Sequence, residues 1–287
     1  MDRLIAFLSA PIPRPILWIG VPILAFLLVI SFVFLRFPFG EFSPTLARQI
    51  SQATGGEVFI GDIESQWTWG GPGMAARDVR IVMPTRSRID IDPLSVRPAW
   101  STSWLLGEPA LKVVAQSTIG SLDGVVEIGD LTSWSGEFTG VDLAQLPLPA
   151  TEGFAVEGIL NGAADLILAP DGAYGPLSFD AVTGQLNHSA LPIGVEFDLV
   201  SADLMLDGPN LVEIRRLEFT GPIIEVSASG NVLPGGPQQE PRLDLGVDLE
   251  IKNPPLRTMM QGMGLPIGQT GRASFSLQGT PSDPRLE

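Results

Sequence analysis

Few side chains in this 287-residue sequence can do chemistry. There is no cysteine and one histidine, His188, which excludes disulfides, thiolate metal sites, cysteine nucleophiles and imidazole clusters. His188 stands in the stretch 186–192, which we interpret as a loop, and no G-x-S-x-G sequence supplies a nucleophile for it. We therefore predict that the chain is not an enzyme and assign no catalytic residue.

Two further patterns match binding motifs only in part. Gly71-Pro-Gly-Met-Ala-Ala76 imitates a dinucleotide fingerprint, but without the strand before it and the helix after it, so we interpret it as a turn. Asp90 and Asp92 would share one face of a strand, with no third ligand in view. We expect a solvated face there, and no metal or cofactor.

Two tryptophans form a third pattern. Trp67 and Trp69 are two residues apart, so on a strand they would share a face. Core or sheet-edge packing is the ordinary role of such residues. Tryptophan is also enriched at binding hot spots, which makes Trp67 and Trp69 our candidate partner-binding residues.

The charge is strongly acidic and uneven. The chain has 17 Lys and Arg against 32 Asp and Glu, a net charge of −15. Residues 1–100 are nearly neutral, so this charge falls in residues 101–287. An acidic body argues against a nucleic-acid partner, which needs basic surface to neutralise phosphates.

A membrane anchor is predicted near the N-terminus. Twenty residues from Ile16 to Leu35 carry no charge, enough for a helix to cross a hydrocarbon core of about 30 Å. The run is longer than a signal-peptide core and lacks a small-residue cleavage site, so we assign residues 16–39 to an uncleaved transmembrane helix. Arg3 and Arg14 favour residues 1–15 in the cytoplasm, with the body, residues 40–287, on the far side.

Beyond the anchor, a short helix is expected before the sequence turns to β patterning. Ser43 suits an N-cap and Pro44 a first helical position, and Thr54-Gly55-Gly56 suits a stop. After Gly56 apolar and polar residues alternate, most clearly from Arg242 to Lys252. Such alternation predicts half-buried antiparallel strands.

Turn signals divide this part into a meander of about a dozen strands. They recur every 10–15 residues, at 107–109, 122–124, 170–172, 206–209 and 234–237. Short helices are expected at Ala99–Leu106 and Pro255–Met263. The predicted fold class is mainly β: a transmembrane helix, then a long antiparallel, curved β-sheet or sandwich with a few short helices.

Several segments resemble known envelope proteins. Leu46–Ile63, followed by Trp67 and by the stretch 79–84, resembles the start of the membrane-anchored GspN family of bacterial type II secretion, and equally resembles AsmA-like envelope proteins. The stretches 92–111, 146–162 and 279–286 are similar to later segments of these families. The resemblance implies a single-pass protein of the bacterial inner membrane with a periplasmic, AsmA-like body, and it carries no catalytic residues.

Two functions follow from that resemblance and stay open. One is a non-enzymatic accessory component of the type II protein secretion system, a scaffold that binds other envelope proteins of the secretion apparatus. The other is an AsmA-like protein that binds or conducts lipid along an apolar groove. Alternation along the strands suits both an open groove and a closed sandwich, because both need one apolar face.

Overall fold

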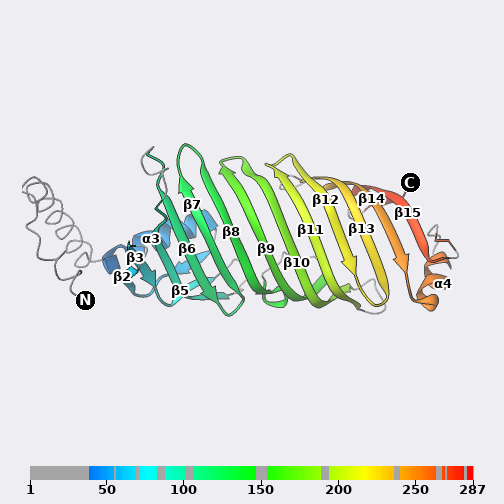
Figure 1. The fold of residues 1–287 in the computed structure, drawn as a ribbon, viewed down its shortest axis with the longest axis horizontal. Coiled ribbons are helices and arrows are strands. Elements are labelled where there is room, and N and C mark those ends of the chain that lie inside the picture. The colour runs from blue at the N-terminus through cyan, green and yellow to red at the C-terminus, as the bar shows by residue number, and fades with distance from the viewer. Residues whose placement is uncertain are drawn as a thin grey trace, which may run out of the picture.

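The computed structural model describes residues 39–54, 56–68, 71–82, 88–100, 107–146, 154–188, 194–235, 240–262, 267–268, 270–280 and 283–286. These residues form one antiparallel sheet of sixteen strands with few helices. Figure 1 shows a long, curved sheet whose strands lie side by side along the molecule and run across its long axis. The prediction of a mainly β body with one long curved sheet is confirmed.

The described chain begins with two short helices. A 3-10 helix, η1 (Phe39–Phe42), leads into the α-helix α3 (Ser43–Thr54), which confirms the predicted helix. Ser43 is buried, and its hydroxyl donates to the carbonyl of Ile60 at 2.9 Å, so it fastens the helix to the chain after β1. The Ser51 hydroxyl accepts the amide of Val58 at 2.9 Å, which ties the last turn of the helix to β1.

The sheet forks at its N-terminal end. Strand β5 pairs with β4 through residues 88–91 and with β3 through residues 94–96, and each of those strands carries one more, β1 and β2 respectively. The strands are β1 (Glu57–Phe59), β2 (Ile63–Thr68), β3 (Gly71–Ala76), β4 (Val79–Val82) and β5 (Arg88–Pro98). The predicted turn at Gly71–Ala76 is therefore wrong: Gly71 starts a strand that pairs with β2 and β5.

From β6 to β15 every strand pairs with the strands before and after it in the chain, and β16 pairs with β15. The order is β6 (Ala110–Ser117), β7 (Ser121–Ile128), β8 (Thr132–Asp142), β9 (Phe154–Ala169), β10 (Gly172–His188), β11 (Val195–Asp207), β12 (Leu211–Thr220), β13 (Ile224–Leu233), β14 (Arg242–Ile251), β15 (Arg272–Thr280) and β16 (Asp283–Leu286). A short 3-10 helix, η3 (Leu143–Gln145), follows β8. The meander is confirmed, with more strands than the dozen expected.

The turn signals have mixed outcomes. Pro170 and Asp171 join β9 to β10, and Gly208, at a φ of 61°, lies in the turn from β11 to β12. The signal at Leu122–Gly124 is wrong, because these residues lie inside β7. His188 ends strand β10, so the predicted loop at that residue is also wrong.

One helix covers part of the sheet near its C-terminal end. Helix α4 (Pro254–Gly262) confirms the predicted helix at 255–263, and Leu256 packs against a cluster of Leu249, Ile251, Ile267 and Ala273. Ile251 is fully buried. In Figure 1 this helix lies at the end of the sheet opposite β2 and β3.

Some predictions fall outside the described residues. The transmembrane helix at 16–39 and the segment 1–15 lie there, apart from Phe39, which starts η1. Within the described part of the chain, no helix has the length and apolar character needed to cross a membrane. Of the helix predicted at Ala99–Leu106, Ala99 and Trp100 are described and are not helical, and the remainder lies outside.

Candidate apolar ligand face

The pairing of the strands builds an apolar face that spans nearly the whole sheet. Residues directly opposite each other in antiparallel strands place their side chains on the same face. Following these pairs from β3 to β15 gives an unbroken row of apolar residues and one glycine, which we call the central row. It consists of Ala76, Leu94, Ala115, Leu122, Phe138, Gly162, Phe179, Ala202, Leu217, Ala228, Val247 and Phe275.

A second row runs beside it, two residues away on most strands. It consists of Met74, Val96, Val113, Gly124, Gly136, Ala164, Leu177, Leu204, Ile214, Gly230, Leu245 and Leu277. Twelve strands about 4.8 Å apart make each row about 50 Å long. Neither row contains a side chain that can form a hydrogen bond to a ligand, apart from the weak thioether of Met74.

Burial along this face is incomplete. Small residues such as Ala202 and Ala228 are 3% and 9% exposed, while their larger neighbours Leu217, Phe179 and Val247 are only half-buried. Among the described residues, Ile251 under helix α4 is the one large side chain below 2% exposure. A second layer that would close the face into a sandwich is therefore absent from the described part of the chain.

Aromatic rings lie close over glycines on the face. A Cβ added to Gly124 would meet the Trp134 ring at 2.4 Å, and one added to Gly162 would meet the Phe138 ring at 2.4 Å. Such distances show that the rings occupy the space left by the missing side chains. The rings thereby cover backbone that would otherwise be exposed at the centre of the face.

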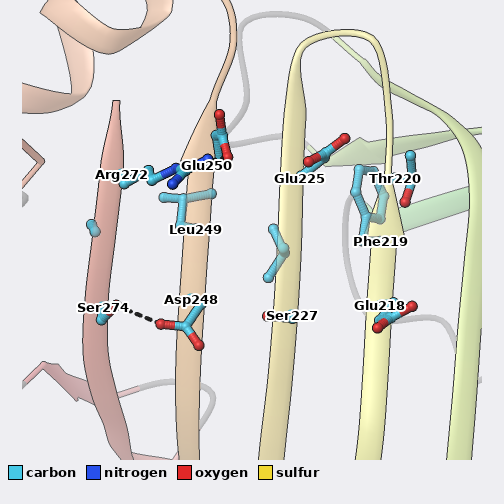
Figure 2. Close-up of a pocket in the computed structure, with 12 residues that line it drawn as sticks. Glu218, Phe219, Thr220, Glu225, Ser227, Asp248, Leu249, Glu250, Arg272 and Ser274 are labelled. Atoms are coloured by element: carbon cyan, nitrogen blue, oxygen red, sulfur yellow. Dashed lines mark hydrogen bonds and ion pairs between the residues drawn. The ribbon is translucent and has the colours of Figure 1, made fainter. Parts of the chain in front are cut away.

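From β9 to β15 the opposite face of the sheet carries a row of polar and acidic residues, and Ile167 of β9 is also exposed on that side. A row of paired residues there consists of Ser274, Asp248, Ser227, Glu218, Ser201, Asp180 and Asn161. Figure 2 shows part of this face, where Glu218, Glu225, Asp248 and Glu250 line a shallow hollow of about 380 Å³ with Arg272 at one side. Arg272 is paired with Glu250 at 3.0 Å, and Ser274 donates to Asp248.

Arginine side chains lower the pKa values of two carboxyl groups on the sheet. The hydrogen bond from Arg216, 2.7 Å away, holds the pKa of Glu218 below its ordinary value. At the other end of the sheet, the hydrogen bond from Arg88, helped by Arg80, does the same for the pKa of Asp90. Both carboxylates are therefore charged and already paired, which suits a solvated structural face.

The described residues among the sequence candidates lie on two different strands, β2 and β5. Trp67 is on β2 with 56% of its surface exposed, so it is neither core nor closely packed, and Trp69 lies outside the described residues. Asp90 and Asp92 lie on β5, where Asp90 bonds arginines. In the described part of the chain, no group of three or more acidic or histidine side chains is placed to hold a metal ion.

Comparison with known proteins yields no match: no family model, no curated protein and no solved structure is detectably similar to this chain.

The sequence predicts an apolar groove only as one of two alternatives, beside a closed sandwich, and it does not predict the two continuous rows. Alternation predicts an apolar side for each strand separately, but the alignment of these sides depends on strand register. The signal in the sequence is the recurrence of glycine among apolar strand residues, as in Gly158–Ala164, which indicates close approach of a neighbouring group.

Proposed function

We propose that this chain is a membrane-anchored, non-enzymatic protein of the bacterial envelope that holds lipid acyl chains on its apolar sheet face. The observation that carries the proposal is the pair of adjacent apolar rows that run across twelve strands with large side chains only half-buried. None of the large side chains in these rows is fully buried, and an extended apolar surface of this kind commonly marks an interaction site.

The chemistry of the face favours acyl chains as the occupant. A peptide laid along the two rows would have to satisfy its own polar backbone groups, because the rows offer almost no hydrogen-bonding side chains. An acyl chain has no such groups, and each buried methylene contributes about 0.8 kcal/mol. A length of about 50 Å also exceeds the hydrocarbon core of a bilayer, about 30 Å, so more than one chain fits end to end.

A matched pair on β10 tests the proposal. Leu177→Glu places a charge in the second apolar row, and Ser178→Glu places the same charge on the polar face one residue later. The full-length protein is reconstituted in vesicles that contain a lipid with a photoreactive acyl chain, and crosslinked peptides are identified by mass spectrometry. We expect crosslinks on apolar-row residues, strongly reduced by Leu177→Glu and unchanged by Ser178→Glu.

Two results would contradict this function. One is crosslinking confined to the segment before residue 39. The other is an equal loss of crosslinks in Leu177→Glu and Ser178→Glu. Circular dichroism of each variant checks that the β-sheet is retained, and Leu177→Met, which keeps the apolar character and the approximate volume, should crosslink like the original protein.

A secretion scaffold is the second candidate function. It rests on the resemblance of Leu46–Ile63 and later segments to GspN proteins, and the acidic polar face supports it because such a face suits basic partner surfaces. Type II secretion components should then co-purify with the tethered protein, and charge reversal at Glu218 and Asp248 should weaken their capture. Unchanged secretion after deletion of the gene, with no such component captured, would reject this candidate.

A further inference from the structure

The β2–β3 hairpin has an unusual distribution of charge along its length. Its base holds Glu64 and Arg77, which form an ion pair at 3.4 Å. Between these two residues the sequence runs for twelve residues without a charge, from Ser65 to Ala76. The far end of the hairpin, where Thr68 pairs with Gly71, can therefore leave water without the cost of removing a charge from it.

Exposed indole rings flank that end. Trp67 pairs with Pro72 and is 56% exposed, and Trp100, which follows β5, is 63% exposed. The Trp100 ring lies against Gly71, since a Cβ on this glycine would be 3.1 Å from Nε1. Gly71 and Pro72 are consecutive strand residues, so the two rings lie on different faces of the hairpin. Indoles with one apolar and one polar part concentrate at the interface between membrane and water.

The path of the chain brings this hairpin near the predicted membrane segment. Helix η1 lies against β2, and it begins at Phe39, four residues after the uncharged run ends at Leu35. Four extended residues span at most about 14 Å. The body beyond residue 100 carries all of the net negative charge, so the near-neutral N-terminal end of the sheet is the part that approaches an anionic bilayer most easily.

We propose that the end of the β2–β3 hairpin contacts the bilayer surface, with Trp67 and Trp100 at the level of the lipid headgroups. This contact orients the sheet so that its apolar face begins at the membrane, because Pro72, the pairing partner of Trp67, is two residues from Met74 in the second row. The inference adds a membrane contact to the proposed lipid-holding function and is tested separately from it.

Single-tryptophan variants of the full chain in phosphatidylcholine vesicles test the contact. In each variant one of Trp67, Trp100 or Trp134 is kept and the other tryptophans become Phe; circular dichroism checks the fold. The vesicles contain phosphatidylcholine brominated either near the headgroup end of the acyl chain or near its terminal methyl, because bromine quenches indole emission on contact. We expect Trp67 and Trp100 to be quenched more strongly by the shallow bromine than by the deep one.

The three tryptophan positions distinguish failure of the membrane contact from failure of the lipid-holding function. Trp100 lies off the apolar face and reports the bilayer alone, whereas Trp134 lies on that face and reports bound lipid. Water-like emission of Trp100 and Trp67 with no quenching at either depth would overturn the membrane contact, even if Trp134 is quenched. Quenching of Trp67 and Trp100 with an unquenched Trp134 would support the contact and count against acyl chains on the face.

Discussion

Two glycines shape the apolar face because their missing side chains leave room for an aromatic ring. Gly124 and Gly136 lie on neighbouring strands, and the Trp134 ring fills the space above both. A side chain at either position would push the ring away from the sheet. Neither residue has a left-handed backbone, so backbone conformation does not explain the two glycines. The close approach of the Trp134 ring does.

Gly136→Ala should destabilise the protein, since the new Cβ would lie 2.6 Å from the Asp123 carbonyl oxygen and 2.8 Å from the Trp134 ring. Overpacking of this kind costs about 1–3 kcal/mol. Gly246→Ala on β14 is the matched control: its Cβ would meet nothing closer than 3.8 Å, and we expect no loss of stability. Chemical denaturation measures both, and equal midpoints would show that the β7 backbone and the Trp134 ring both adjust at little cost.

Tyr174 offers a direct reading of local electrostatics, because it is the sole tyrosine of the chain. Its hydroxyl donates to Asp171 at 2.8 Å, and this bond, with partial burial and the nearby carboxylates, raises the pKa of Tyr174 above its ordinary value. The raised pKa means that the bond stabilises the fold below about pH 10 and that this contribution disappears as the pH rises through the folded-state pKa. Asp171→Asn should lower the midpoint of the phenol titration, followed by ultraviolet absorbance; an unchanged midpoint would contradict the role of Asp171.

Among the helices and strands, the sequence predicts correctly those whose own residues carry a clear pattern. The alternation from Arg242 to Lys252 produced β14, and the helix that begins at Ser43 formed as expected. The failures share a different cause: Gly71–Ala76 and Leu122–Gly124 have turn composition but lie in strands, because pairing with two neighbouring strands outweighs local preference. The apolar face itself depends on register among twelve strands, which no local pattern contains.

Helix α4 provides a test at this level. It begins at Pro254, and the side chain of Asn253 accepts the amide of Leu256 at 3.2 Å, an N-cap bond. Asn253→Ala should cost about 1 kcal/mol, the ordinary value of such a cap. Thr258→Ala removes an exposed hydroxyl bond within the same helix and should change stability far less. Denaturant midpoints compare the two variants, and an equal effect would show that the cap contributes nothing specific.

Considered as a whole molecule, this sheet resembles a repeat array more than a globule. From β6 to β15 each strand pairs only with its two neighbours in the chain, and the buried cluster under α4 lies at one end. Stability in such an arrangement is approximately a sum of terms from neighbouring strands. Damage at one end should then remain local instead of unfolding the entire sheet at once.

Ile251→Ala tests whether damage at the C-terminal end of the sheet stays local. Ile251 has no exposed surface and packs with Leu249, Ile267 and Ala273, so its truncation should cost about 2–5 kcal/mol within the C-terminal cluster. Hydrogen exchange followed by mass spectrometry should become faster in β13, β14, β15 and α4, and remain unchanged in β6–β9. The matched control is Ile159→Ala on β9, where the side chain is 41% exposed and exchange should change little anywhere. Faster exchange throughout the sheet after Ile251→Ala would instead show that the strands unfold as a single cooperative unit, and a ligand held near Trp134 would then be released by damage at either end.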